Sequence, residues 1–352
     1  NDLYDREFVD LWCYGFEELA ERARDYPLDE VAEITEIPAE EIAAAARRIG
    51  AAERAILQWG VAIDQIKETI PTAQAVLALF EITGNIGKPG TMQQPASILN
   101  YAAGWGSEFL TPEQEAKRIG QEAHPLIKMG FQECVTDDYI RCLETGEPYP
   151  IKVAWMQTTN PLACTGVDAK RTLAAHMNID TIVVVDLFMT PTAMALADYF
   201  LPACTYAERN GLRIGDGAQR AETINKAIEP LGESRSDMQI TLDIGKRISP
   251  EAWPWETVED LFSDILEETG HSFEEMQELA PGYPPFDYRM HEKGLLRTDG
   301  NPGFQTATGR IELWSTLYNS LGLDPLPSYE EPVPSPRSTP ELTGEYPLVL
   351  TT

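Results

Sequence analysis

The chain has 352 residues, of which 43% are hydrophobic and 24% charged, a composition typical of folded globular proteins and a length sufficient for two or more domains. Its 27 basic and 57 acidic residues give a formal net charge of −30, which argues against a nucleic-acid or anionic-membrane surface, because such surfaces need clustered positive charge. No apolar run approaches the roughly 20 residues that span a bilayer.

The first fifty residues predict helices. Over residues 1–27, aromatic and apolar side chains recur at helical spacing and indicate two short amphipathic helices. Residues 28–35 indicate a third helix, and Pro38 suits the first turn of a fourth, which Gly50 closes. We expect residues 1–50 to form a helical segment that completes or joins a preceding domain.

The next hundred residues predict one strand-helix unit and a long insertion. Residues 54–60 read as a buried strand, and residues 69–82 as a long apolar helix. The turn between them lacks the GxGxxG pattern of nicotinamide-binding proteins. Residues 85–106 are rich in Gly, Asn, Gln, Ser and Thr and predict a long loop. We place an insertion at about 85–150, with its clearest helix over 137–144.

The stretch from residue 151 to 211 organises the rest of the chain. It predicts, in order, a strand over 151–157, a helix within 167–178, a strand over 181–186, a helix over 192–197 and a short strand over 199–201. Short Val and Ile runs favour parallel strands buried on both faces, joined by right-handed crossovers. We therefore predict an α/β fold over residues 51–250: a Rossmann-like, doubly wound, mainly parallel sheet with helices on both faces.

Polar residues follow each of these strands, and they define our candidate site. They are Thr159, Asn160, Cys164 and Thr165 after the first strand, and Asp186 and Thr190 after the second. Ligands of such sheets bind at the carboxyl ends of the strands. A carboxylate at a strand end can accept two parallel N–H bonds from a guanine edge, or bond a ribose hydroxyl. The alternative is that Asn160 and Asp186 only cap helices, and that Thr190 is the N-cap before Pro191.

The remaining residues predict additions to this fold. We expect loops over 208–211 and 215–220, helices over 237–247, 255–268 and 272–279, a hairpin and strand over 303–313, and a proline-rich linker over 323–340. Residues 251–340 would then form a helical and irregular extension. The apolar run that ends the chain predicts that residues 341–352 begin a C-terminal domain.

The sequence shows no complete catalytic or metal-binding apparatus. Five cysteines and four histidines occur without metal-ligand spacing, and there is no Ser-His-Asp set or P-loop. We therefore assign no catalytic residue and no metal ligand. Cys164 favours packing or ligand contact over nucleophilic attack, because no histidine lies near it in sequence.

Several motifs follow one another along most of the chain. They are Gln58-Trp59-Gly60, the glycine-rich residues 82–90, Asn160-Pro161, residues 183–192, Ala197-Asp198 with Leu201-Pro202, Glu208-Arg209-Asn210-Gly211, and Gly303-Phe304-Gln305-Thr306 with Gly309-Arg310-Ile311-Glu312-Leu313. In this order and at these spacings the chain resembles the molybdopterin oxidoreductase family of the dimethyl-sulfoxide-reductase type, which includes formate dehydrogenases and nitrate reductases. As a set, the motifs are highly specific.

The resemblance implies that most of the chain is the third of four domains and holds one of two molybdopterin guanine dinucleotides. Gly60 would approach the pterin or its phosphates. Asn160, with Thr159 and Cys164 beside it, would lie against the dinucleotide. Where relatives often have glycine before this turn, the chain has Thr158-Thr159, a departure from the pattern that affects the expected approach of the backbone to the ligand.

The same resemblance extends to the second strand and beyond. Val185 and Asp186 would recognise the guanosine end of the dinucleotide, in agreement with the guanine edge inferred from the strand-end carboxylate. Thr190 and Asp198 match positions that also contact the dinucleotide in relatives.

For the intact protein the resemblance implies a molybdenum or tungsten enzyme of anaerobic respiration, with two-electron or oxygen-atom transfer to or from a small-molecule substrate. A 4Fe-4S cluster and the side chain that ligates the metal would precede Asn1, a β-barrel domain would begin near Leu348, and an iron–sulfur subunit would be the electron-transfer partner. The chain alone, as an internal fragment, would be inactive.

The rival interpretation is a cofactor-free structural subunit of an electron-transfer complex, which has no need of Asp186, Asn160 and the glycines at 84–90 together.

Overall fold

The structure is a computed structural model that describes residues 3–63, 66, 69–93, 110–124, 134–166, 168–215, 218–279 and 287–348. The chain divides into two compact units, unit 1 with residues Asn1–Ala96 and Phe286–Thr352, and unit 2 with residues Ser97–Pro285. This division groups the residues differently from the predicted domains, whose boundaries stay predictions.

The described part of unit 1 is mainly helical, and the four predicted N-terminal helices and the helix after residue 69 are confirmed. The helices are α1 (Arg6–Trp12), α2 (Phe16–Arg22), α3 (Leu28–Thr35), α4 (Ala39–Gly50), α5 (Thr69–Glu81) and α13 (Thr316–Ser320), with 3₁₀ turns η1 (Ala23–Asp25), η2 (Val61–Ile63) and η9 (Pro340–Leu342). In α4, two glutamates lie in the first turn and two arginines in the last, which complements the helix dipole.

The core of unit 1 joins the two ends of the chain. Strand β1 (Cys13–Tyr14) pairs in parallel with β7 (Ile311–Glu312). His291 lies 2% exposed among aromatic rings: its ring stacks on Phe304 with centroids 5.0 Å apart, and Trp12 meets it edge-on at 5.0 Å. His291 Nε2 finds no hydrogen-bond partner within the described residues, and burial lowers the pKa of this imidazole.

The buried strand predicted over residues 54–60 is wrong. The segment is irregular, and Ile56 is 68% exposed. A strand needs a neighbouring backbone to take its hydrogen bonds in a ladder. Here side chains take them singly: the backbone N–H of Ala55 donates to Asn85 Oδ1 at 2.8 Å, and that of Leu57 to Met92 Sδ at 3.4 Å.

Two further predictions in unit 1 need qualification. The loop predicted over 85–106 shows tight turns over 85–93, closed by Met92 N donating to Asn85 O at 3.0 Å, while its remainder lies outside the described residues. The hairpin predicted over 303–313 is wrong and only its strand is confirmed. Phe304 N donates to Gly309 O at 2.9 Å and closes a turn, so that β7 is left to pair with β1.

Unit 2 contains a parallel sheet of three strands in the order β2-β3-β4. The strands are β2 (Val153–Gln157), β3 (Thr181–Asp186) and β4 (Tyr199–Pro202). Trp155 aligns with Val183 across the first pair, and Val185 aligns with Leu201 across the second. The strands predicted in this stretch are thereby confirmed.

Helices cover both faces of this sheet. Side chains from Ala154 and Met156 of β2 and from Ile182 and Val184 of β3 pack against α7 (Thr136–Thr145), α8 (Ala169–His176) and α9 (Pro191–Leu196). On the other face, Val185 packs against α10 (Asp237–Ile248). Val184 and Val185 are both 0% exposed, so adjacent residues of β3 are buried on opposite faces, as the Val run predicts.

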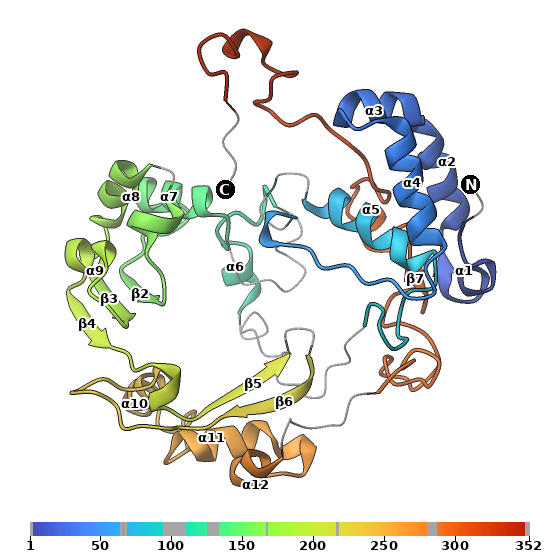
Figure 1. Cartoon of the computed structure of the whole chain (residues 1–352). Helices are drawn as coiled ribbons and strands as arrows, with labels where there is room; N and C mark the ends of the chain where they lie inside the picture. The colour runs from blue at the N-terminus through green and yellow to red at the C-terminus, as the bar shows by residue number, and fades with distance from the viewer. Residues whose placement is uncertain are drawn as a thin grey trace. The chain divides into compact units, whose positions relative to one another are not determined.

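The three strands follow chain order, and both crossover helices, α8 and α9, lie on the same face. Figure 1 shows β2, β3 and β4 side by side with α7, α8 and α9 near them. A doubly wound sheet also reverses its direction of growth, and the described strands contain no such reversal. The chain is therefore a mixed α/β protein with parallel strands, and its doubly wound character stays a prediction.

The second part of unit 2 is an antiparallel hairpin covered by helices. Strands β5 (Gly211–Gly215) and β6 (Ala218–Ile224) pair, so the loops predicted at 208–211 and 215–220 are wrong where they overlap these strands. Ala221 is 0% exposed and packs with residues of α11 (Val258–Ile265) and α12 (Phe273–Glu278). This long-range packing, rather than the polar local sequence, makes the segment a strand.

The helices predicted at 237–247, 255–268 and 272–279 are confirmed, the first one residue longer than predicted and the other two with shorter ends. Thr257 with Asp260, and Ser272 with Glu275, form capping boxes that begin α11 and α12. The short elements of unit 2 are α6 (Pro112–Glu115), η6 (Pro161–Thr165), η7 (Tyr206–Glu208) and η8 (Glu267–Thr269). In the part of the chain that the structure describes, every helix falls short of the length and hydrophobicity that crossing a membrane requires.

Candidate functional site

The turn after β2 begins at a strained residue. Thr158 has φ +54°, a left-handed conformation that β-branched residues rarely adopt. Its backbone N–H donates to Val185 O at 3.1 Å, so the hydrogen bonding between β2 and β3 extends one residue past the strand. The backbone thus takes a conformation that glycine adopts easily.

Asn160 and Pro161 open a single π-helical turn, η6. The backbone O of Asn160 accepts from Ala163 N at 3.1 Å and from Cys164 N at 2.9 Å, and Gly166 N donates back to Pro161 O at 2.8 Å. Cys164 is exposed and unpaired with other thiols. The turn holds Cys164 at the carboxyl edge of the sheet, and its contact with a ligand stays a prediction.

The side chain of Asn160 links this turn to the helix after β3. Its Oδ1 accepts from Thr192 Oγ1 at 2.7 Å and from Thr192 N at 3.4 Å. Thr192 Oγ1 in turn accepts from Leu162 N at 3.1 Å. Thr192 is 0% exposed. Its position directly after Thr190 and Pro191 indicates a helix start in the sequence, but it does not predict the contact with Asn160.

The turn after β3 is organised by Asp186. Its Oδ1 accepts from Leu187 N at 2.7 Å and from Phe188 N at 3.3 Å, a side-chain-to-backbone turn typical of aspartate. Asp186 Oδ2 accepts no hydrogen bond from the described residues. Thr190 then caps α9, since its side chain accepts from Ala193 N at 3.2 Å, as the sequence predicts.

The residues beyond Asp186 form an apolar surface at this edge of the sheet. They are Leu187, Phe188 and Met189 of the turn and Met194 of α9, with exposed fractions of 48%, 72%, 53% and 68%. Consecutive exposed apolar side chains of this kind mark a contact surface more often than a solvated one. We call this group the β3 turn surface.

The start of α10 approaches the same edge from the other face of the sheet. Gln157, the last residue of β2, donates through Nε2 to Asp237 Oδ1 at 2.9 Å. Trp155 Nε1 donates to Gln157 Oε1 at 2.9 Å. The carboxyl edge of the sheet therefore carries two carboxylates, Asp186 and Asp237, one at a strand end and one at a helix start.

Asp198 lies at the opposite end of the sheet. Its Oδ2 accepts from Ile182 N at 2.8 Å, and its backbone N–H donates to Ile182 O at 2.9 Å. Ile182 is near the amino end of β3. The structure therefore does not bring Asp198 together with Asn160 and Asp186, and its predicted ligand contact stays a prediction.

Two other predicted residues have limited access or belong elsewhere. Val185 is 0% exposed and its carbonyl already accepts from Thr158 N, so its predicted ligand contact stays a prediction. Gly60 belongs to unit 1, next to η2, and an added Cβ there would meet nothing within 4 Å. That open space is compatible with close approach of a ligand to the Gly60 backbone.

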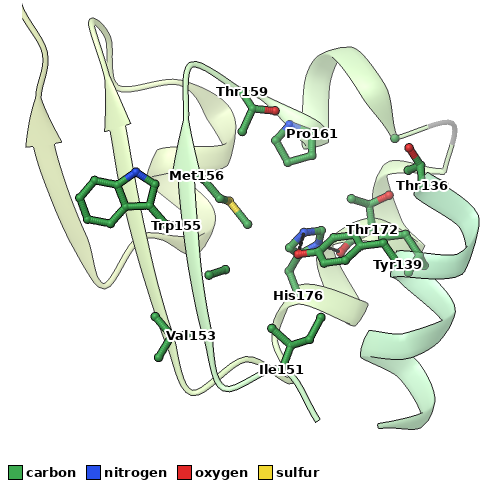
Figure 2. A pocket seen from close by; sticks show the side chains of 13 residues that line it. Thr136, Tyr139, Ile151, Val153, Trp155, Met156, Thr159, Pro161, Thr172 and His176 are labelled. Carbon is green, nitrogen blue, oxygen red and sulfur yellow. Dashed lines mark hydrogen bonds between the residues drawn. The ribbon is translucent and has the colours of Figure 1, made fainter. Parts of the chain in front are cut away.

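A cavity of about 470 Å³ lies beside β2. Thr159 and Pro161 line one end and Ile151 the other, while Tyr139 of α7 and His176 of α8 lie together on the side that faces β2 (Figure 2). Neither Asn160 nor Asp186 lines this cavity. It is large enough for a small ligand, yet it is separate from the pair of turns that sequence reasoning selected.

The polar wall of this cavity is the Tyr139–His176 pair. His176 Nδ1 lies 2.7 Å from Thr172 O, so Nδ1 carries the proton, and Nε2 accepts from Tyr139 Oη at 3.3 Å. Burial raises the pKa of the Tyr139 phenol to about 12. The phenol therefore stays protonated at neutral pH and acts as a hydrogen-bond donor.

The described residues contain no group of three or more His, Cys, Asp or Glu side chains placed to hold a metal ion. What the carboxyl edge offers is different: a carboxylate with one unused oxygen at Asp186 and an amide with a fixed orientation at Asn160. These groups suit the hydrogen-bonding edges of a large polar organic ligand.

Comparison with known proteins gives the family context of this site. Residues 30–247 match the family described as molybdopterin oxidoreductase. The chain is 31% identical over 379 residues to acetylene hydratase from Syntrophotalea acetylenica, with 99% of this chain and 50% of the relative covered. It is 25% identical to formate dehydrogenase H from Escherichia coli, with 100% and 48% covered.

A solved structure agrees with this assignment. The acetylene hydratase from Pelobacter acetylenicus superimposes with a TM-score of 0.86 and 31% identity, over 98% of this chain and 50% of that structure. The chain thus spans about half the length of the relatives it matches.

Proposed function

The chain belongs to the molybdopterin oxidoreductase family of enzymes, and from this premise we propose that unit 2 binds one molybdopterin guanine dinucleotide at the carboxyl edge of its sheet. The intact protein would then be a molybdenum or tungsten enzyme that carries two such dinucleotides and performs two-electron or oxygen-atom transfer on a small molecule. In this proposal the sheet belongs to a Rossmann-like, doubly wound domain.

The observation that carries this proposal is the state of the Asp186 carboxylate. Oδ1 is held by two backbone N–H groups, which fixes the orientation of the side chain. Oδ2 keeps its full acceptor capacity towards the described residues. A guanine edge presents N–H donors, and Oδ2 is open to accept from one of them, while Oδ1 already accepts two backbone N–H bonds.

The other predicted positions have supporting roles in this proposal. Thr159, Asn160 and Cys164 would contact the dinucleotide from the turn after β2, and Thr190 from the start of α9. Val185, which is buried in the sheet, is included on the family resemblance alone, as are Gly60 and Asp198.

The bound cofactor would supply the redox-active metal and its electron-accepting ligands. The residues of this chain would bind and orient the dinucleotide, and they would transfer no proton and form no bond to the metal. The remainder of the proposal concerns the intact protein: a 4Fe-4S cluster, a β-barrel domain after this chain, and an iron–sulfur subunit that exchanges electrons with it.

The test is cofactor analysis of the full-length protein produced anaerobically. We expect molybdenum or tungsten in the protein, and GMP after acid hydrolysis of its cofactor. Protein with neither would favour the cofactor-free structural subunit.

Asp186→Ala should lower the GMP content, and Asp186→Asn should do the same while keeping an oxygen for Leu187 N and Phe188 N. Unchanged GMP in both variants would remove the guanine-recognition role.

A second candidate function is addition of water to an unsaturated bond. The observation that favours it is the 31% identity and TM-score of 0.86 to proteins named acetylene hydratase. Incubating the reduced, metal-loaded protein with acetylene and measuring acetaldehyde separates the two functions. Acetaldehyde formed without consumption of an electron acceptor would support hydration. Conversion of acetylene only when an electron acceptor is added would support electron transfer.

A further inference from the structure

We propose that the buried hydroxyl of Thr192 is a positioning group that fixes which end of the Asn160 amide faces the ligand. This inference rests on the proposed dinucleotide site. It adds to that site a residue for which neither the motifs nor the strand-end pattern provided a role.

The first step is the hydrogen-bond inventory of Thr192. Its hydroxyl donates to Asn160 Oδ1 at 2.7 Å and accepts from Leu162 N at 3.1 Å. A threonine hydroxyl has one donor, and that donor is used. Both partners lie on the turn after β2, so one buried hydroxyl joins the turn after β2 to the helix after β3.

The second step concerns the orientation of the Asn160 amide. A backbone N–H can only donate, and Thr192 N lies 3.4 Å from the amide atom of Asn160 that also receives the hydroxyl proton. That atom is therefore the oxygen. The NH₂ group must then point away from α9, and it makes no hydrogen bond with the described residues.

The third step follows from the chemistry of the free group. The NH₂ group offers two donors, which suit acceptor oxygens such as those of a phosphate or a pterin carbonyl. The neighbouring turn offers the opposite chemistry, since Asp186 Oδ2 is an acceptor. The two turns together thus present a donor and an acceptor to one ligand, and Thr192 fixes the relative placement of the turns.

The experiment uses the full-length, cofactor-loaded protein and measures how fast GMP-containing cofactor is released at a fixed temperature. Thr192→Val removes the hydroxyl and keeps the shape of the side chain. We expect release to accelerate about ten- to hundred-fold, the loss of one or two hydrogen bonds to a polar or charged ligand. Thr192→Ser should restore a release rate near that of the wild type.

Asn160→Asp is the second variant, because it leaves an oxygen for Thr192 while it replaces the NH₂ donors with an acceptor. We expect the same acceleration, with a thermal unfolding midpoint of the cofactor-free protein near that of the wild type. A wild-type release rate in Asn160→Asp would overturn the inference, even if Thr192→Val did not fold. A wild-type rate in Thr192→Val would overturn it as well.

Asp186→Asn, measured in parallel, separates this inference from the proposed function. If wild-type protein holds the dinucleotide and Asp186→Asn loses it, while the Thr192 and Asn160 variants behave as wild type, the inference fails and the proposed function stands. If wild-type protein holds no dinucleotide, the proposed function fails and the inference with it.

Discussion

Each unit buries a histidine within its described residues, and the two units surround that histidine differently. In unit 2, His176 is 1% exposed and both ring nitrogens have partners, Thr172 O and Tyr139 Oη. In unit 1, His291 is 2% exposed among aromatic rings, and its Nε2 makes no hydrogen bond with a described residue, the nearest carboxylate oxygen, Glu292 Oε1, lying 3.8 Å away. The same side chain is thus satisfied in one unit and unsatisfied in the other.

Two glutamates, one in each unit, show a similar contrast. Glu208 of unit 2 accepts from Thr205 N and Thr205 Oγ1 at 2.8 Å and from Leu231 N at 2.9 Å, and these bonds lower the pKa of its carboxyl. Glu81 of unit 1 has its pKa raised to about 7 by burial. We infer that Glu208 keeps its charge around neutral pH, whereas Glu81 of unit 1 exchanges a proton there.

The largest expected effect tests the pH sensitivity of unit 1 through Glu81. Its folded pKa of about 7 lies above the ordinary 4.5, so the folded state binds more protons between these values. The contribution of Glu81 to the free energy of unfolding is therefore fully present below about pH 4.5 and is lost as the pH rises to about 7. For this partly exposed side chain we expect a loss of about 1–3 kcal/mol, and Glu81→Gln should abolish it.

Urea unfolding at several pH values measures this effect. Wild type and Glu81→Gln should differ in slope between pH 4.5 and 7 and run parallel above it. Parallel curves over the whole range would remove Glu81 as the source of the pH dependence.

The next effect tests the satisfied histidine of unit 2. His176→Phe deprives Tyr139 Oη and Thr172 O of their partner, and an unpaired buried polar group costs about 1–3 kcal/mol. We expect a loss of about 2 kcal/mol in the free energy of unfolding, within that range. Tyr139→Phe, which removes one of the two bonds, should cost less. Equal stability of His176→Phe and wild type would show that these bonds contribute nothing.

His291→Phe should have a smaller effect of opposite sign. Replacing an unsatisfied buried polar group with an apolar one of similar shape is neutral or stabilising, here by about 1 kcal/mol at most. Burial is the largest influence on the pKa of His291 and lowers it, while the charge of Glu292 raises it and that of Arg289 lowers it. Because the folded pKa lies below the ordinary 6.5, the unfolded state binds more protons, and wild type should lose stability as pH falls below 6.5. The variant should lack this acidic decline in thermal unfolding. A destabilised variant at neutral pH would contradict the contrast between the two histidines.

The smallest effect concerns backbone strain in unit 2. Thr158→Gly removes the cost of a left-handed β-branched residue and adds entropy to the unfolded chain. We expect a net gain of about 0.5 kcal/mol from these opposing terms. Thr159→Gly is the matched control, since Thr159 is not among the positive-φ residues, and it should destabilise. Destabilisation by Thr158→Gly would show that the threonine side chain contributes more than the strain costs.

The sequence predicted the elements whose signals are local. The Val run of β3 is buried on both faces, and the Thr190-Pro191 pair begins α9 with Thr190 as cap, as their residue types require. The carboxyl edge with Asn160 and Asp186 was predictable for the same reason, because residues that follow parallel strands share one edge.

The failures have a common physical cause in long-range contacts. Residues 54–60 have the composition of a strand but no described backbone partner, and residues 218–220 have the composition of a loop but pair with β5. Thr192 reads as an ordinary residue of a helix start, and its role depends on Asn160, 32 positions earlier. The periodicity of apolar residues cannot predict such pairings, because it depends only on residues that are near neighbours in sequence.

The β3 turn surface also provides a built-in reporter. Met189 and Met194 stand on either side of the Thr190-Pro191 helix start and are 53% and 68% exposed. Exposed methionine thioethers oxidise readily to sulfoxides. Mild peroxide treatment followed by peptide mass analysis would therefore read out, without any label, whether a cofactor or another segment of the protein shields this edge of the sheet.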